Sequence, residues 1–402
     1  MPPQNTEKFI AWSEALYATD TPATETATPE TLATETPTPD SRPLTFDLPS
    51  RIRHDPRVPD LYAIARALLF QLDAERAHTL SLRALRAAEK SRLLGLAYPP
   101  RECLSPVEQM GLRFPSRLGL AAGLDKEGNT IDALGRFGFG FIEIGTITPR
   151  PQPGNNKPRL FRLIDHRAII NRMGFNNPGI TEAVENVARS TSFDGIIGFN
   201  IGKNKDTPND RAADDYLACL REAYPVADYL AVNLSSPNTP GLRNLQGADT
   251  CARLLESLKK TQAELAQTHG KYVPLLLKVA PDLDDPHIAD LSRVFLDGGL
   301  DGLIATNTTL DRSPVADHPR AEEAGGLSGA PLRKKSTAIL RAFASHLDGR
   351  IPIIGVGGVA TPDDAVEKIS AGASLVQLYS SFIYHGPAIV SAINDRLDRL
   401  GD

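Results

Sequence analysis

The sequence predicts an α/β fold, a closed parallel (β/α)8 TIM barrel preceded by a small N-terminal helical hairpin. From about residue 112 onward, eight short apolar runs alternate with helix-length segments, and nearly every run ends in polar or glycine residues. The eight strand candidates are residues 118–123, 141–148, 196–202, 229–235, 274–280, 302–307, 351–357 and 374–379. A doubly wound open sheet is the structural alternative. In a barrel these polar endings share one rim, which predicts a site there.

Composition limits the class of protein. The chain has 402 residues, 41% of them hydrophobic and 23% charged, which suits a soluble globular protein of one large and one smaller domain. A formal net charge of -5 argues against nucleic acid as the main partner. Cys103, Cys219 and Cys251 form no C-x-x-C pair, which argues against disulfides and metal sites and favours a reducing compartment. No apolar run approaches the roughly 18–20 residues needed to cross a bilayer.

We expect residues 1–50 to form a disordered head. Up to about residue 43 the head is rich in Thr, Pro, Ala and Glu, and apart from residues 9–17 it lacks the apolar residues that offset the entropy of ordering. It is acidic and nearly free of arginine, unlike a mitochondrial transit peptide, and it has no signal-peptide core.

Residues 51–100 are predicted to form two helices. An apolar stripe recurs at helical spacing in the first, at Leu61, Ile64, Ala65, Leu68, Leu69 and Leu72. Asp73 is the expected N-cap of the second, which carries Ala77, Leu80, Ala84 and Ala87 on one face. The segment is locally basic, with Arg51, Arg53, Arg57, Arg66, Arg76, Arg83, Arg86, Lys90 and Arg92. Two interpretations stay open: a hairpin packed on the main domain, and an amphipathic pair on an anionic membrane surface.

Residues 101–402 are assigned to the barrel, with extra strand signal over residues 160–170. Lys278 lies inside the fifth apolar run, where a lysine is costly to bury unless an anion or a strong acceptor meets it. The glycine run 355–358, followed by Tyr379 and Ser380 after the eighth strand, matches the usual phosphate site of such barrels. A phosphate site with a cation near a ring predicts a phosphorylated cofactor, and FMN is the natural candidate.

The fourth strand runs directly into a polar stretch, residues 232–243. Prolines and a glycine stop the strand, while Asn233, Ser236 and Asn238 offer both donors and acceptors for a small polar pocket. An ordinary turn is the alternative for this stretch taken alone.

Several motifs together resemble the quinone-linked (class 2) dihydroorotate dehydrogenases. They are Gly119-Leu120-Ala121-Ala122-Gly123-Leu124-Asp125-Lys126, Glu143-Ile144-Gly145-Thr146-Ile147-Thr148-Pro149, Asn171-Arg172-Met173-Gly174-Phe175-Asn176-Asn177, Asn200-Ile201-Gly202-Lys203-Asn204, Lys278-Val279-Ala280-Pro281-Asp282, Thr306-Asn307-Thr308-Thr309 and Gly325-Gly326-Leu327-Ser328-Gly329, with the stretch after the fourth strand and the last two strand ends. They run in family order over roughly residues 58–398.

The resemblance implies oxidation of (S)-dihydroorotate to orotate in pyrimidine synthesis, with FMN as the hydride acceptor. Ser236 would remove the C5 proton while hydride leaves C6. Because an isolated serine hydroxyl is a poor base, its proton must pass on, through Thr239 or a water. The soluble class 1 enzymes carry cysteine at this position, so Ser236 favours class 2.

The resemblance also implies binding roles. The carboxylate of the substrate would meet Lys126, and the substrate site would comprise Lys126, Asn171, Arg172, Met173, Gly174, Phe175, Asn233, Asn238, Asn307 and Thr308. FMN would be held by Ala122, Gly123, Thr146, Asn200, Asn233, Lys278, Thr306, Ser328, Gly329, Gly357, Gly358, Tyr379 and Ser380. Lys278 would stabilise negative charge at the flavin N1/O2 edge. No metal is expected.

The helical hairpin gains a role from the resemblance, as the element that docks on an anionic membrane surface and admits ubiquinone or menaquinone. His78 and Arg162 match the family's polar residues near the quinone head, and residues 240–247 are a candidate lid. We expect a monomer on the cytoplasmic face of a bacterial inner membrane, with the mitochondrial inner membrane as the alternative. The rival functions are a class 1-type enzyme that uses fumarate or NAD, and a catalytically silent flavin-binding barrel.

Overall fold

The computed structural model describes residues 61–99 and 105–400. The described residues all belong to one compact unit, which lies within residues 52–402. The predicted head, the basic residues Arg51, Arg53 and Arg57, and Cys103 lie outside the described residues.

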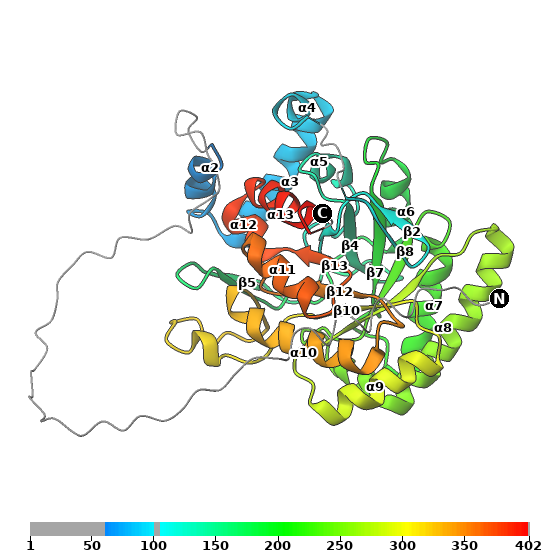
Figure 1. The fold of residues 1–402 in the computed structure, drawn as a ribbon. Coiled ribbons are helices and arrows are strands. Elements are labelled where there is room, and N and C mark those ends of the chain that lie inside the picture. The colour runs from blue at the N-terminus through cyan, green and yellow to red at the C-terminus, as the bar shows by residue number, and fades with distance from the viewer. Residues whose placement is uncertain (1–60, 100–104, 401–402) are drawn as a thin grey trace, which may run out of the picture. The chain divides into compact units, whose positions relative to one another are not determined.

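Eight parallel strands close into a barrel, in the order β10-β12-β13-β3-β4-β7-β8-β9 (Figure 1). Their bounds are β3 Leu118–Leu120, β4 Phe141–Ile147, β7 Ile196–Ile201, β8 Tyr229–Asn233, β9 Leu275–Val279, β10 Gly302–Ala305, β12 Ile353–Val356 and β13 Leu375–Leu378. All eight predicted strands are therefore confirmed, and closure excludes the open sheet. Side chains alternate along β4, where Ile142 and Ile144 join the outer core under the helices while Phe141 joins the core inside the barrel.

Helices cover the outside of the barrel (Figure 1). They are α5 Ile131–Gly135, α6 Ile180–Ala188, α7 Ala212–Ala223, α8 Ala248–His269, α9 Asp285–Asp297, α10 Arg333–Leu347, α11 Pro362–Ser370, α12 Ser380–His385 and α13 Ala388–Asp398. Short 3-10 turns occur at η2 Asn209–Arg211, η3 Leu242–Gln246, η4 Ser313–Val315 and η5 Ala330–Leu332. The apolar faces of the longer helices and the outward side chains of the strands form the largest buried cluster, which fixes the strand ends in place.

The N-terminal end of the barrel is closed by a hairpin of β1 Val107–Gln109 and β2 Leu112–Phe114. Phe114 is fully buried, and its ring lies 5.2 Å from that of Phe141, edge to face. Because this end is filled with apolar side chains, the open end of the barrel is the C-terminal rim.

A second, three-stranded sheet stands beside that rim, with the order β11-β6-β5. Its strands are β5 Leu160–Leu163, β6 Ala168–Asn171 and β11 Gly326–Gly329. The predicted strand signal at residues 160–170 is thus an antiparallel hairpin whose two strands pair from Leu160 with Asn171 to Leu163 with Ala168.

The N-terminal helices α2 Leu61–Leu69, α3 Ala74–Lys90 and α4 Leu93–Ala97 pack on the same unit. Asp73 caps α3 as predicted, accepting hydrogen bonds from the backbone N–H groups of Glu75 at 3.1 Å and Arg76 at 3.0 Å. The α2 helix is held by its Tyr62 hydroxyl, which donates to the Ile383 carbonyl at 2.6 Å.

The face of α3 that packs on the barrel differs from the predicted apolar face. Leu85 and Ala88 pack against the core, whereas Leu80 is 51% exposed and Ala84 and Ala87 are exposed. The larger Leu85 contributes more burial than an alanine, so the helix turns that side inward. Of the four residues of the predicted face, only Ala77 is buried. Within residues 61–99 and 105–400, no helix is long and apolar enough to span a bilayer.

Candidate active site

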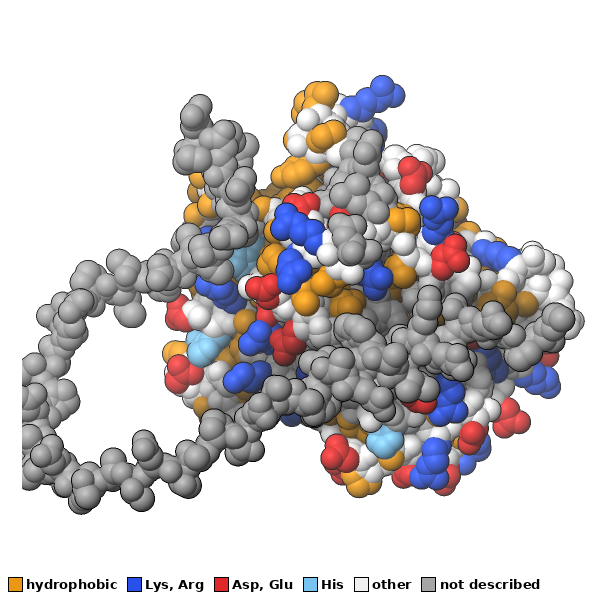
Figure 2. Space-filling model, viewed as in Figure 1, with side chains coloured by type: hydrophobic (Ala, Val, Ile, Leu, Met, Phe, Trp, Pro, Cys, Tyr) orange, Lys and Arg blue, Asp and Glu red, His pale blue; other side chains and the backbone are white. Residues whose placement is uncertain are grey.

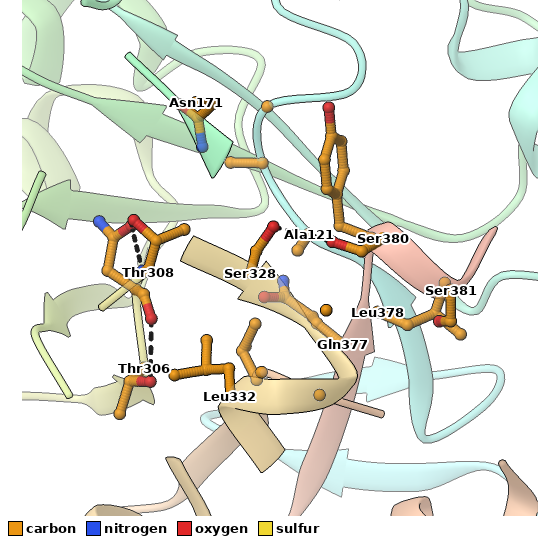
Figure 3. A pocket seen from close by; sticks show the side chains of 18 of the residues that line it. Ala121, Asn171, Thr306, Thr308, Ser328, Leu332, Gln377, Leu378, Ser380 and Ser381 are labelled. Atoms are coloured by element: carbon orange, nitrogen blue, oxygen red, sulfur yellow. Dashed lines mark hydrogen bonds between the residues drawn. The ribbon is translucent and has the colours of Figure 1, made fainter. Parts of the chain in front are cut away.

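A pocket opens at the C-terminal rim, between the strand ends, the three-stranded sheet and helices α3 and α12. Figure 3 shows Asn171, Thr306, Ser328, Gln377 and Ser380 reaching it from different strands and helices. Of the predicted site residues, those that line it are His78, Ala122, Gly123, Lys126, Thr146, Asn171, Met173, Gly174, Phe175, Asn233, Ser236, Asn238, Lys278, Thr306, Asn307, Thr308, Ser328, Gly329, Gly357, Gly358, Tyr379 and Ser380. Convergence of these separated stretches is what the barrel prediction required.

The end of β8 carries a connected set of polar groups. Asn307 donates from Nδ2 to Asn233 Oδ1 at 3.1 Å and to Ser235 Oγ at 3.0 Å, and Ser235 Oγ donates to the Lys278 carbonyl at 2.6 Å. Ser236 is buried three residues beyond the strand, and its Oγ accepts a hydrogen bond from the Asn238 backbone N–H at 3.3 Å. The strand end therefore holds a hydroxyl in a fixed place next to two oriented amides.

Lys278 is buried, as its position in an apolar strand predicted, and an anion meets it. Its Nζ lies 3.1 Å from Glu143 Oε1, and Glu143 itself has no exposed surface. The pairing satisfies both charges inside the barrel, where either one alone would be costly.

Lys126 follows β3 in a loop that Asp125 organises. The carboxylate of Asp125 accepts from the backbone N–H groups of Gly128 at 2.9 Å and Thr130 at 2.8 Å, while Lys126 donates from Nζ to the Gly123 carbonyl at 2.5 Å. Burial lowers the pKa of Lys126 to about 8, against an opposing effect of the Glu75 carboxylate. The ammonium is therefore still charged at neutral pH and can meet an anionic ligand.

Asn171 and Asn238 face each other across the pocket. Asn238 donates from Nδ2 to Asn171 Oδ1 at 3.2 Å, and Asn238 Oδ1 is buried with no hydrogen-bond partner among the described residues. Buried acceptors are almost always paired in folded proteins, so this oxygen indicates a ligand that carries a donor.

The predicted phosphate loop after β12 needs its glycines. Gly357 and Gly358 have φ angles of 109° and 76°, and a Cβ on Gly358 would lie 2.4 Å from backbone atoms of Arg333 at the start of α10. The loop thus lies directly against that helix start, with its N–H groups free of side-chain bulk.

The side of the pocket away from the barrel is formed by His78, Leu160, Arg167, Tyr384 and His385, from α3, the β5–β6 hairpin and α12. Burial, with a smaller contribution from the positive charge of Lys126, lowers the pKa of His78 to about 3. His385 Nε2 is buried without a partner among the described residues. On this side of the pocket, single polar side chains are surrounded by apolar ones.

Four predicted residues do not line the pocket. Arg162 turns to α2, bonding the Leu69 carbonyl at 3.2 Å with its guanidinium 4.5 Å from the Phe70 ring centre. Arg172 pairs with Glu323 at 2.7 Å. Asn200 lies beneath the pocket and Thr239 is buried in the loop beyond Ser236.

Other lining residues had no assigned role in the sequence-based prediction. Gln377 ends the eighth strand, and its Oε1 is buried with no partner among the described residues. Its place at a strand end was a usable signal. The sequence around Arg167 and His385 carries no such signal, because their approach to the pocket depends on how the β5–β6 hairpin and α12 fold over the rim.

The candidate lid, residues 240–247, contains η3, and its Arg243 side chain bonds it to the neighbouring strand ends. Arg243 donates to the Ser235 carbonyl at 3.2 Å and the Thr308 carbonyl at 2.9 Å, and it forms an ion pair with Asp282 at 2.9 Å. The loop is therefore attached to the same strand ends that carry the polar site.

Comparisons with known proteins agree on one family. The sequence profile of dihydroorotate dehydrogenases matches residues 105–400. The chain is 62% identical over 332 residues to the dihydroorotate dehydrogenase (quinone) of Akkermansia muciniphila, covering 83% of this chain and 95% of the relative. It is 58% identical to that of Chromobacterium violaceum, covering 82% and 95%. A ligand-free DHODH structure from Eimeria tenella matches with a TM-score of 0.75 and 38% identity, over 81% of this chain and 94% of that one.

Proposed function

Because the chain belongs to the dihydroorotate dehydrogenase family, we propose that its pocket holds FMN beside the substrate and that Ser236 is the catalytic base. The enzyme oxidises dihydroorotate to orotate in pyrimidine biosynthesis and uses a quinone as the electron acceptor. The observation that carries the proposal is the convergence of Ser236, Lys126 and four asparagines on one pocket.

The residues present fit FMN. Gln377 Oε1 is a buried acceptor in need of a donor, which the ring N–H of a flavin provides, and the glycine loop at 357–358 leaves backbone N–H groups open to a phosphate. The residues that would hold it are Ala122, Gly123, Thr146, Asn233, Lys278, Thr306, Ser328, Gly329, Gly357, Gly358, Tyr379 and Ser380, with Asn200 acting from beneath through Asn233. When bound, FMN takes a hydride from the substrate and supplies electrons for the quinone, chemistry that no side chain provides.

Ser236 would take the C5 proton of dihydroorotate. Ser236 lines the pocket, and the Asn238 N–H at 3.3 Å occupies one lone pair of its hydroxyl, which leaves the other to accept a proton. The hydroxyl must lose its own proton as it gains one, and Thr239 or a water is the proposed acceptor.

Lys126 would hold the substrate carboxylate, and the asparagines would orient the ring. An ammonium with a pKa of about 8 is largely charged at neutral pH, and its partly buried position strengthens the ion pair. Asn238 Oδ1 offers the acceptor that a ring N–H needs. Arg172 would contribute through its backbone, because its side chain is engaged with Glu323.

The N-terminal helices would bring the protein to a membrane and admit the quinone past His78. Among the described residues, six of the ten exposed large apolar side chains lie in this short segment, at Ile64, Leu68, Leu72, Leu80, Leu93 and Leu96. Figure 2 shows apolar and basic side chains together over α4 at the top of the view. Such a surface suits peripheral contact with anionic lipid, and we place the protein on the cytoplasmic face of a bacterial inner membrane.

We propose that the protein works as a monomer. Arg162 would support the quinone site indirectly, since it fixes the turn between α2 and α3.

The test is dihydroorotate-dependent reduction of a soluble quinone by the purified protein, with fumarate and NAD assayed in parallel. We expect turnover with the quinone alone. Use of fumarate or NAD instead would leave the barrel site standing and contradict the role given to the helices. Bound flavin without turnover on any acceptor would favour the silent barrel.

A further inference from the structure

Glu143 lies beneath the pocket, on β4, and touches neither solvent nor the pocket surface. Its carboxylate nevertheless accepts hydrogen bonds from four strands of the barrel. Oε1 accepts from Asn200 Nδ2 at 2.7 Å and from Lys278 Nζ at 3.1 Å. Oε2 accepts from Gln377 Nε2 at 2.9 Å and from the Tyr229 hydroxyl at 3.2 Å. An ionised carboxylate can only accept, so each partner must present a donor to it.

This requirement orients a chain of amides. Because Asn200 gives its NH2 to Glu143, its Oδ1 faces the other way and accepts from Asn233 Nδ2 at 3.1 Å. Asn233 in turn presents Oδ1 to Asn307 Nδ2 at 3.1 Å. Three carboxamides therefore point the same way, beginning at the carboxylate.

The other end of the chain has the same polarity. The backbone N–H of Thr308 donates to Asn307 Oδ1 at 2.8 Å, and that of Ser235 donates to Asn233 Oδ1 at 3.3 Å. A reversed Asn200 would set two carbonyl oxygens or two NH2 groups against each other somewhere along the chain. The network is consistent only while residue 143 is an acceptor.

The second branch ends at Gln377. Its NH2 is committed to Glu143, which leaves Oε1 directed into the pocket as an unpaired acceptor. In Figure 3 the Gln377 side chain extends into the middle of the pocket. A reversed amide would offer a donor there instead.

We infer that Glu143 is a positioning residue that sets which pocket amides act as donors and which as acceptors, and thereby the fit to a pyrimidine ring. The inference rests on the proposed function, since it assigns Asn233 and Asn307 to the substrate. Glu143 sets this donor and acceptor pattern through Asn200 and Gln377, while Lys278 is its ion-pair partner.

The test is Glu143→Gln in the FMN-loaded protein, with orotate binding followed by the change in flavin absorbance. Glutamine keeps the shape of the side chain but places an NH2 against at least one donor. We expect the orotate dissociation constant to rise about tenfold or more, since one mismatched buried hydrogen bond has roughly that effect. A role confined to charge predicts the opposite sign, because removing a buried negative charge favours an anionic ligand. An unchanged or lower dissociation constant would overturn the inference.

The chain provides a matched control at the other end of the barrel. Asp301, just before β10, accepts from Lys259 Nζ at 3.1 Å, Gln262 Nε2 at 2.8 Å and the Tyr272 hydroxyl at 2.5 Å. It holds the same kinds of partner as Glu143 but does not line the pocket. Asp301→Asn should leave orotate binding within about twofold of wild type.

A second variant covers the case in which Glu143→Gln does not fold. Asn200→Ala keeps the Glu143–Lys278 pair and cuts the chain between Glu143 and Asn233, and it should also weaken orotate binding. Orotate binding equal to wild type in Asn200→Ala would overturn the inference by itself. If the wild-type protein bound no orotate, the proposed function would fail; wild-type binding matched by Glu143→Gln would defeat only the role of Glu143.

Discussion

The pocket has two walls that differ in how their polar groups are connected. The inner wall, made by the strand ends, is a continuous hydrogen-bonded set that runs from Glu143 through Asn233 to Asn307. The outer wall, made by His78, Leu160, Arg167, Tyr384 and His385, sets single polar groups among apolar ones and leaves His385 Nε2 unpaired among the described residues. The connected inner wall fixes the hydrogen-bond donors and acceptors that a pyrimidine ring would meet. The loosely connected outer wall suits an apolar molecule, such as a quinone, that enters and leaves.

The largest effect should come from the inner wall, at Ser236. Ser236→Ala removes the proposed base, and general-base catalysis contributes roughly 10²- to 10⁴-fold, so we expect turnover to fall by that range with FMN still bound. Steady-state quinone reduction and the flavin spectrum measure the two properties. Ser313→Ala, at an exposed serine remote from the pocket lining, is the control. Retained turnover in Ser236→Ala would eliminate Ser236 as the base.

Lys126 should show the next largest effect and a defined pH dependence. The pKa of about 8 means that the ammonium is charged below pH 8 and neutral above it, while the orotate carboxylate stays ionised throughout. Orotate affinity should therefore be constant below pH 8 and fall up to about tenfold per pH unit above it.

Lys126→Met tests that assignment. It should bind orotate roughly 10- to 100-fold more weakly at pH 7, the cost of losing a charge-assisted hydrogen bond, and show no fall in affinity above pH 8. Lys334→Met, at an exposed lysine on α10, should behave as wild type. A surviving alkaline fall in Lys126→Met would assign the titration to another group.

Substitutions at Leu68 and Leu96 test whether the N-terminal helices bind a membrane independently of catalysis in the barrel. They are 68% and 83% exposed, so placing a glutamate at both should leave the fold and soluble-quinone turnover intact while weakening binding to anionic vesicles several-fold. Vesicle co-sedimentation measures the loss. Leu400→Glu, at a 43% exposed leucine near the C-terminal end, should still bind vesicles. If the variant with glutamate at Leu68 and Leu96 sedimented with vesicles as well as Leu400→Glu does, the N-terminal helices would not be the membrane contact.

The two walls also differ in how far the sequence could predict them. Asn233 was identified because an apolar run followed by polar residues marks a strand and its rim position, and Lys278 because it is a lysine inside an apolar run. The pairing of Lys278 with Glu143 was not, although Glu143 also interrupts an apolar run. β4 and β9 are separated by β7 and β8 in the sheet, so their side chains meet only across the closed interior.

On the outer wall, the family resemblance assigned Arg162 to the quinone site, but its side chain does not line the pocket. Leu160 and Arg162 lie on the same side of β5 by the two-residue period, but the long Arg162 side chain reaches the carbonyls that end α2. Arg167, in the turn between β5 and β6, lines the pocket instead, from a backbone with a φ of 48°. Turn geometry of this kind is not encoded in hydrophobic periodicity.

His78 should give the smallest effect, and it decides whether the outer wall takes part in proton transfer. A pKa of about 3 keeps the ring neutral from pH 5 to 9, so quinone reduction should show no titration from His78 in that range. His78→Asn keeps a polar group of similar reach, and we expect a change of no more than about threefold in the quinone KM, with the pH profile unchanged. An acidic limb near pH 6 that disappears in His78→Asn would show that the histidine is protonated during turnover. The outer wall would then take part in proton transfer. The proposal that only the inner wall reacts, while the outer wall admits the quinone, would be wrong.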